Sequence, residues 1–247
     1  MRTIKKVASH IFIDGFGGMT QGLFATLIIG TMIQQIGLLI GGSTGNVIYL
    51  LGKAAAALTS AGIGVGVAVK YGESPLVTVS AAVAAMVGGY AGKITGGTFF
   101  VDGNAVLAGP GEPLGAFIAA FAGITCGHLV SGKTKVDIIV TPVITIGAGS
   151  VVGLLVGPPI SQMMTGLGSI INWATEQRPF IMGIVVSVVM GMVLTLPISS
   201  AALGIILNLS GLAAGAATIG CCCNMVGFAV ASYRENKFGG LVAQGLG

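Results

Sequence analysis

Apolar residues occur along this chain in long blocks, and charged residues lie almost entirely in the short gaps between those blocks. Each block runs about 18 to 25 residues, the length that an α-helix needs to cross ~30 Å of hydrocarbon. A soluble helix carries polar residues along one face, whereas these blocks leave no polar face. The pattern predicts an all-α protein, a polytopic integral membrane helical bundle with broken or re-entrant helices.

The blocks predict about six full spans plus a C-terminal hairpin. The last block, residues 198–232, is too long for one helix and short for two, which favours a hairpin of short or re-entrant helices. The six spans are expected at residues 19–41, 46–69, 75–94, 114–130, 136–156 and 180–196.

We expect residues 1–247 to form a single transmembrane domain, because no soluble segment is long enough to fold separately. Residues 1–15 are expected to form an interfacial helix, since His10 and Asp14 interrupt the apolar run and no small-residue cleavage site follows. Residues 19–131 would hold the first four spans, and residues 136–233 would form a half with broken helices.

Composition supports a lipid environment. Only 18 side chains are charged (11 basic and 7 acidic), and 43 residues are glycine. Inside a soluble helix each glycine costs about 1 kcal/mol relative to alanine, but helices in lipid use glycine for close packing. Glycine pairs four residues apart therefore indicate helix packing and a subunit interface; they are Gly88/Gly92, Gly123/Gly127, Gly149/Gly153, Gly153/Gly157 and Gly211/Gly215.

The basic residues predict the orientation. With the N-terminus in the cytoplasm, and with the last block entering and leaving from the same side, eight of the eleven fall on the cytoplasmic side, as the positive-inside rule requires. The long external loop then carries Asp102 and Glu112. The net charge of +4 thus reflects topology, and we expect no nucleic-acid partner. The eight residues are Arg2, Lys5, Lys6, Lys70, Lys133, Lys135, Arg234 and Lys237.

Two sequence motifs resemble metal-binding or nucleotide-binding sites but have simpler explanations. Cys126 and the run Cys221–Cys223 lie within apolar blocks and lack the spacing of a zinc or redox site, so we expect no metal and no cofactor. Residues 127–134 match the phosphate-loop pattern G-x-x-x-x-G-K-T. That loop binds phosphate between a strand and a helix of a soluble domain, and here it would join two membrane helices, so we assign no catalytic residue.

Two prolines fall inside apolar runs, Pro142 after Thr141 and Pro197 after Leu196. Proline removes a backbone donor, and transporters use the resulting breaks to bind solutes at mid-membrane depth. An ordinary kink is the alternative. Weakly similar segments, Glu73–Leu76 and Glu112–Leu114, also lead two Gly-rich spans of opposite direction, which suggests an inverted repeat.

Candidate solute-binding residues are polar side chains placed in or beside apolar blocks, because burying them unpaired is costly. Residues 102–104 and 109–113 flank a short apolar insert, which predicts a loop that folds back toward the membrane. For the loop, the alternative is an ordinary connection exposed to solvent. For the polar side chains within spans, the alternative is that they only form hydrogen bonds between helices. The candidates are Asp102, Asn104, Glu112, Thr141, Asn208 and Asn224, with His128 as an outside candidate.

Two segments resemble a known family: residues 103–117, which contain GPGEPLGAF, and residues 223–236, which read CNMVGFAVASYREN. Both resemble the membrane (IIC) component of a subgroup of bacterial phosphotransferase-system sugar permeases, which includes perfringolysin-regulator-type proteins. The resemblance implies a bacterial inner-membrane location, a homodimer, and sugar translocation linked to phosphorylation by cytosolic phosphoryl-carrier proteins.

The sequence therefore predicts a IIC-type permease for a sugar or related small polar solute, with the lipid bilayer as its solvent and no catalytic activity of its own. Two alternatives stay open. One is a channel or secondary transporter without phosphoryl coupling, and the other is a membrane regulator that senses a ligand without moving it.

Overall fold

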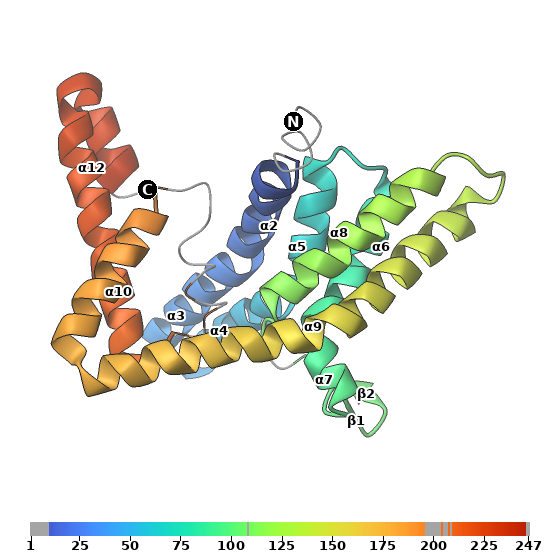
Figure 1. The fold of residues 1–247 in the computed structure, drawn as a ribbon, viewed down its shortest axis with the longest axis horizontal. Coiled ribbons are helices and arrows are strands. Elements are labelled where there is room, and N and C mark those ends of the chain that lie inside the picture. Colours follow the sequence, from blue (N-terminus) through green and yellow to red (C-terminus); the bar gives the residue numbers. More distant parts are fainter. Residues whose placement is uncertain (1–9, 108, 196–203, 205–206, 208, 246–247) are drawn as a thin grey trace. The chain divides into compact units, whose positions relative to one another are not determined.

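The computed structural model describes residues 10–107, 109–195, 204, 207 and 209–245 (Figure 1). Helices make up 84% of the structure, and the described residues contain a single two-stranded sheet, which confirms the all-α prediction. The chain divides into two compact units, Met1–Gln162 and Met163–Gly247. A single transmembrane domain over residues 1–247 stays a prediction.

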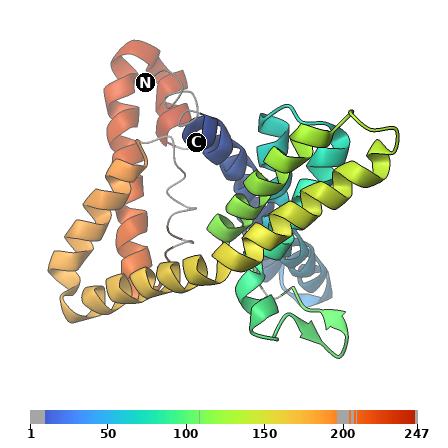
Figure 2. The same cartoon turned by 45° about the vertical axis from the view of Figure 1, so that its right-hand side comes forward.

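The helices of the first unit follow the predicted spans. The segment from α2 to α3 corresponds to span 19–41, the pair α4–α5 to span 46–69, α6 with α7 to span 75–94, and α8 to span 114–130. In both ribbon views α5, α6 and α8 lie side by side (Figure 1, Figure 2). The elements are the π-helices η1 (His10–Gly15) and η2 (Phe24–Ile28), and α2 (Phe16–Leu23), α3 (Ile29–Ile40), α4 (Gly42–Ala57), α5 (Thr59–Lys70), α6 (Pro75–Gly89), α7 (Ala91–Thr95), α8 (Pro113–Val130) and the first part of α9 (Asp137–Gln177).

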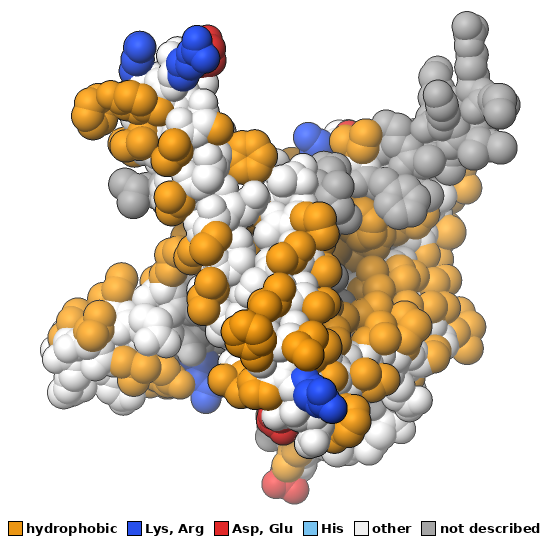
Figure 3. All heavy atoms as spheres, turned by 60° about the vertical axis from the view of Figure 1, so that its left-hand side comes forward, with side chains coloured by type: hydrophobic (Ala, Val, Ile, Leu, Met, Phe, Trp, Pro, Cys, Tyr) orange, Lys and Arg blue, Asp and Glu red, His pale blue; other side chains and the backbone are white. Residues whose placement is uncertain are grey.

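Length and composition fit a membrane. Among the described residues four helical segments are long and apolar enough to cross one, and the pair α4–α5 makes a fifth if it counts as one span bent by 53°. α6 and α10 (Pro179–Val193) are apolar but shorter. Hydrophobic side chains cover much of the face in Figure 3. The four segments are Ile13–Ile40, Pro113–Val130, Asp137–Gln177 and Gly211–Val242.

Glycines bring the first two spans into backbone contact. A Cβ added to Gly18 would lie 2.6 Å from the carbonyl oxygen of Gly66, and a Cβ added to Gly30 would lie 2.8 Å from that of Gly52. Such contacts leave no room for a side chain, so small residues set this antiparallel pairing. The facing pairs are Gly18–Gly66, Gly22–Gly62, Gly30–Gly52 and Gly37–Gly45.

Glycine also allows α8 and α9 to pack closely. A Cβ added to Gly149 of α9 would lie 2.6 Å from the carbonyl oxygen of Ala119 and 2.6 Å from the Cβ of Ala84, whereas a Cβ at Gly147 would meet nothing within 4 Å. Gly149 therefore lies in the packed core of the first unit, and Gly147 lies on an open face of the same helix.

α6 and α8 begin in the same way and run antiparallel. Each has proline as its first residue and a polar residue as its N-cap: Ser74 accepts from the amide of Val77 at 3.4 Å, and Glu112 accepts from the amide of Leu114 at 3.1 Å. Proline suits the first helical position because its missing N–H would be unpaired there. The two helix starts therefore share one local design, and the inverted repeat stays a prediction.

A short β-hairpin follows α7. Its strands are β1 (Phe100–Val101) and β2 (Asn104–Ala105), with Phe100 opposite Ala105 and Val101 opposite Asn104. The two turn residues have φ of 50° at Asp102 and 77° at Gly103. Aspartate followed by glycine favours this two-residue turn because both positions need positive φ. The hairpin was not predicted from the sequence.

The predicted helix break at Pro142 is wrong, because α9 is helical from Asp137 to Gln177 and contains Pro142, Pro158 and Pro159. Pro142 is the sixth residue of the helix, so its missing donor deprives only the carbonyl of Ile138, close to a helix start where the backbone hydrogen bonds have just begun. Membrane helices tolerate proline when neighbouring groups adjust.

The second unit contains the end of α9, α10 and α12 (Gly211–Gly245). At Lys237 the backbone leaves the helical conformation, with φ 52° and ψ −142°. The chain then folds back, since a Cβ added to Gly245 would lie 3.3 Å from the Cβ of Ala229, whereas a straight helix would separate these residues by about 24 Å. A hairpin therefore turns at Lys237, which the sequence did not predict.

Several predicted features lie outside the described residues. These are residues 3–9 of the expected interfacial helix, the break at Pro197, the first part of the block 198–232, and the candidate Asn208.

Packing at Gly149 yields a test. We expect Gly149→Ala to lower the free energy of unfolding by about 1–3 kcal/mol, because the added methyl group overpacks the contact with Ala119. The measurement is thermal unfolding of the purified protein in detergent, followed by circular dichroism.

Gly147→Ala is the matched control, because it makes the same change two residues away on the open face. We expect no loss of stability there. Equal destabilisation by both variants would contradict the packing described for α8 and α9.

Candidate functional site

Three interruptions of helical structure meet in the first unit. α4 gives way to α5 at Leu58, α6 gives way to α7 at Tyr90, and residues 109–112 lead into α8. Hydrogen bonds join all three. Residues 57–60, 89–90 and 109–112 are together named the break junction, and residues 109–112 alone are named the fold-back loop.

Two buried hydroxyl groups bind the fold-back loop. The hydroxyl of Tyr90 donates to the carbonyl oxygen of Gly109 and, at 3.2 Å, to that of Ala57. The Ser60 hydroxyl donates to the carbonyl oxygen of Pro110 at 2.9 Å. Tyr90 is 1% exposed and Ser60 is fully buried. These donors satisfy carbonyl groups that interrupted backbone leaves outside regular structure.

Glu112 links the fold-back loop to two helix ends. Its amide donates to the carbonyl oxygen of Gly89 at 2.7 Å, which satisfies the end of α6. Its carboxylate accepts from the amides of Leu114, at 3.1 Å, and Gly115, which caps the start of α8. A carboxylate at a helix N-terminus is stabilised by the helix dipole, and its remaining lone pairs can accept hydrogen bonds from a ligand hydroxyl.

The break junction meets the α4–α5 span near its middle. Ser60 is ten residues from the end of α5 at Lys70, which at 1.5 Å per residue is about 15 Å. α4 continues for 16 residues beyond the break. A span that crosses ~30 Å of hydrocarbon therefore has its break well below the surface. This is the position at which interrupted helices expose backbone groups to a solute in transporters.

The opposite ends of α6 and α8 are also joined. His128 Nδ1 lies 2.9 Å from a carboxylate oxygen of Glu73, and the hydroxyls of Ser74 and Ser131 lie 3.0 Å apart. His128 is largely exposed, with 71% of its side chain accessible. Beside these residues, burial and the carboxylate of Asp14 raise the pKa of Tyr71 to about 12, so its phenol stays protonated at neutral pH.

Thr141 is fully buried and supports the start of α9. Its hydroxyl donates to Asp137 Oδ1 at 2.6 Å, and the same oxygen accepts from the amide of Gly132 at 2.9 Å. One turn further along, Thr145 is also buried, and its hydroxyl has no hydrogen-bond partner among the described residues. Thr141 therefore has a clear structural partner in Asp137.

Asp102 and Asn104 are exposed at the turn of the β-hairpin, where the Asn104 side-chain amide donates to the Asp102 carbonyl oxygen at 3.3 Å. The hairpin connects to the break junction through aromatic rings: Phe99 lies 5.3 Å from Tyr90 and 4.9 Å from Phe100, centroid to centroid. The Asn104 side chain thus supports the turn in this structure.

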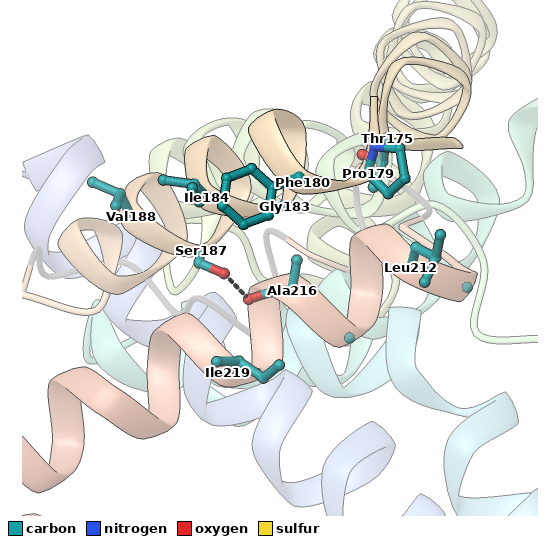
Figure 4. Close-up of a pocket in the computed structure, with 12 residues that line it drawn as sticks. Thr175, Pro179, Phe180, Gly183, Ile184, Ser187, Val188, Leu212, Ala216 and Ile219 are labelled. Carbon is teal, nitrogen blue, oxygen red and sulfur yellow. Dashed lines mark hydrogen bonds between the residues drawn. The ribbon is translucent and has the colours of Figure 1, made fainter. Parts of the chain in front are cut away.

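Asn224 belongs to the second unit. It is half-buried on α12, and a Cβ added to Gly191 of α10 would lie 3.8 Å from its Cβ. The same pair of helices forms an apolar groove of about 520 Å³ that is lined almost wholly by hydrocarbon (Figure 4). Ser187 is one of its few polar residues, and its hydroxyl donates to Ala216 within the protein. The groove offers little to a polar solute.

Of the candidates that the structure describes, Glu112 alone lies at the break junction. Two residues that hold its loop, Ser60 and Tyr90, were not among the candidates. Ser60 comes after a run of alanines and the pair Leu58-Thr59. A hydroxyl residue at this place is typical of the start of a helix, so the sequence gives no sign of a further role. Tyr90 interrupts the Gly-rich end of α6. Both signals are weak in sequence because their partners are about 50 and 19 residues away.

A bundle of apolar helices, several of them long enough to cross a membrane, defines a polytopic membrane protein. The family model "Phosphotransferase system, EIIC" matches residues 13–247, so the chain belongs to that family. This confirms the resemblance seen in residues 103–117 and 223–236. Members are membrane components that work with other phosphotransferase proteins and sugar substrates. Comparisons with curated proteins and with solved structures gave no match.

The Thr141 contact yields a stability prediction. We expect Thr141→Val to lower the free energy of unfolding by about 2 kcal/mol, because it removes a hydrogen bond to the Asp137 carboxylate. Thermal unfolding in detergent measures the change.

Thr125→Val is the control, since the exposed Thr125 donates only to Phe121 of its own helix. We expect a change within about 0.5 kcal/mol there. A Thr141→Val protein as stable as the control would show that the Asp137 contact contributes nothing.

Proposed function

We propose that this chain is the permease component of a phosphotransferase system and moves a sugar or related small polar solute across the bacterial cytoplasmic (inner) membrane. It would act as a homodimer together with cytosolic phosphoryl-carrier proteins. The observation that carries the proposal is the break junction, where one carboxylate and several backbone carbonyls meet inside a span of a chain that belongs to the EIIC family.

The chemistry of the junction suits a hydroxylated solute. Carbonyl and carboxylate oxygens accept hydrogen bonds, and a sugar offers many hydroxyl donors. Glu112 is the residue we assign to solute binding there. Asp102 and Asn104 would contribute only if the β-hairpin moved relative to the junction, and Asn208 and Asn224 stay candidates from the sequence.

The ends of α6 and α8 support a cytoplasmic N-terminus. The bonds between residues 73–74 and residues 128–131 place Lys70 and the pair Lys133 and Lys135 at one end of the first unit. Because α6 and α8 span the unit, the hairpin with Asp102 lies beyond their other ends. The positive-inside rule assigns the lysine-bearing end to the cytoplasm.

Counterflow of labelled sugars into proteoliposomes, with and without phosphoryl-donor proteins, tests the proposal. We expect saturable counterflow of at least one sugar and retention of the phosphorylated product only when donors are present. Uptake that ignores donors would identify a channel or secondary transporter. Saturable binding without flux would identify a regulator that senses its ligand.

Two variants test the assigned residues. We expect Glu112→Gln to raise the Kd for the sugar that shows counterflow at least about 30-fold, because a charged hydrogen bond of about 2 kcal/mol is lost. Glutamine still offers one oxygen to cap α8, so the fold should persist. For Asn224→Ala we expect binding to be lost, as the sequence-based assignment of Asn224 requires, and a scintillation proximity assay measures the Kd of both variants.

Glu176→Gln, at an exposed position in α9, is the control and should bind as the unchanged protein does. Size-exclusion chromatography in detergent verifies that every variant remains a folded dimer. Unchanged affinity in both Glu112→Gln and Asn224→Ala would remove the binding site as assigned.

A further inference from the structure

We propose that the hydroxyl groups of Tyr90 and Ser60 are positioning groups for Glu112: they hold the fold-back loop on the α4–α5 break so that the carboxylate faces the solute. Its consequence for binding rests on the proposed function, whereas its structural part does not.

Tyr90 connects three elements with one side chain. Its ring packs against Phe99 of the hairpin strand region, and the Lys93 ammonium lies 5.4 Å from the ring centroid. Its hydroxyl has one hydrogen, and both the Gly109 and Ala57 carbonyl oxygens lie within its reach. The hydroxyl therefore bridges the last residue of α4 and the first residue of the fold-back loop.

Ser60 holds the next residue of the loop. Its hydroxyl bonds to the Pro110 carbonyl oxygen, and a Cβ added to Gly111 would lie 2.5 Å from the same hydroxyl oxygen. Gly111 also has φ of 76°, which favours glycine. The loop can thus approach Ser60 this closely only because residue 111 has no side chain.

These two donors decide where Glu112 lies. Among the described residues, three hydrogen bonds tie the fold-back loop to α5, to Tyr90 and to the end of α6, and two of them come from side chains. The third is the bond from the Glu112 amide to the carbonyl oxygen of Gly89. It holds residue 112 and does not by itself fix residues 109–111. A further bond from Tyr90 to Ala57 connects this arrangement to α4. Without the hydroxyls, residues 109–111 lose every polar link to the helices, and Glu112 loses its support on one side.

Amide hydrogen exchange read by mass spectrometry tests the positioning without any solute. In lipid nanodiscs we expect Tyr90→Phe and Ser60→Ala each to speed exchange in peptides covering residues 109–115 about tenfold, because local opening becomes easier. Tyr90→Phe keeps the ring contacts with Phe99 and Lys93, so it removes the hydroxyl alone.

Matched controls make the same chemical changes elsewhere in the unit. Tyr71→Phe removes a hydroxyl beyond the far end of α5, about 16 Å from Ser60 along the helix. Ser80→Ala alters another buried serine, nine residues before Gly89 on α6. We expect neither control to change exchange at residues 109–115.

Equilibrium binding of the tritiated sugar that shows counterflow completes the test. We expect the Kd to rise at least about tenfold in Tyr90→Phe and Ser60→Ala and to stay unchanged in both controls at equal melting temperature. Unchanged exchange in both variants, or faster exchange with unchanged Kd, would overturn the inference. A wild-type protein that binds no sugar would overturn the proposed function instead, and the exchange result would still decide whether the hydroxyls hold the loop.

Discussion

In hydrocarbon, a backbone N–H or C=O group that leaves a helix must find its partner inside the protein, because lipid supplies none. This constraint explains why three interruptions occur together at the break junction. The end of α6 receives the Glu112 amide, and the end of α4 receives the Tyr90 hydroxyl. The carbonyl groups of the fold-back loop receive Tyr90 and Ser60. Any one interruption alone would leave polar groups in lipid.

The hydrogen bonds of the break junction require helices whose backbones are in contact, and glycine residues allow that contact. A Cβ added to Gly115 of α8 would lie 2.8 Å from the carbonyl oxygen of Gly88, one residue before the end of α6. The same residue that allows the close packing thus brings the start of α8 within hydrogen-bonding distance of Gly89. The high glycine content, which would weaken a soluble helix, is here a condition for the polar site.

The sequence predicts the positions of the apolar helices in the first unit, because lipid selects long apolar blocks that can be identified one segment at a time. The number of spans differs from the predicted six: among the described residues four or five candidates are long enough, because α6 and α10 are shorter. It also predicts that the segment around Glu112 folds back, from the turn residues on either side of a short apolar insert. It does not reveal Ser60 and Tyr90, because their roles depend on partners brought close only by folding. The helix break predicted at Pro142 was wrong for a related reason. The effect of a proline depends on its position in the helix, and near a helix start it removes few backbone hydrogen bonds. Asp102 and Asn104 stay predicted ligands, and Asp102-Gly103 is also a turn signal that accounts for the hairpin.

The antiparallel pairing of α6 and α8, joined at both ends, has an electrical consequence. The partial positive charge at the start of each helix lies beside the partial negative charge at the end of the other, so the two macrodipoles oppose each other. The pair therefore presents little net dipole to the transmembrane potential, which acts mainly on whole charges that cross the field. A voltage across the bilayer would accordingly exert little force on this pair of helices and would act instead on whole charges within the field.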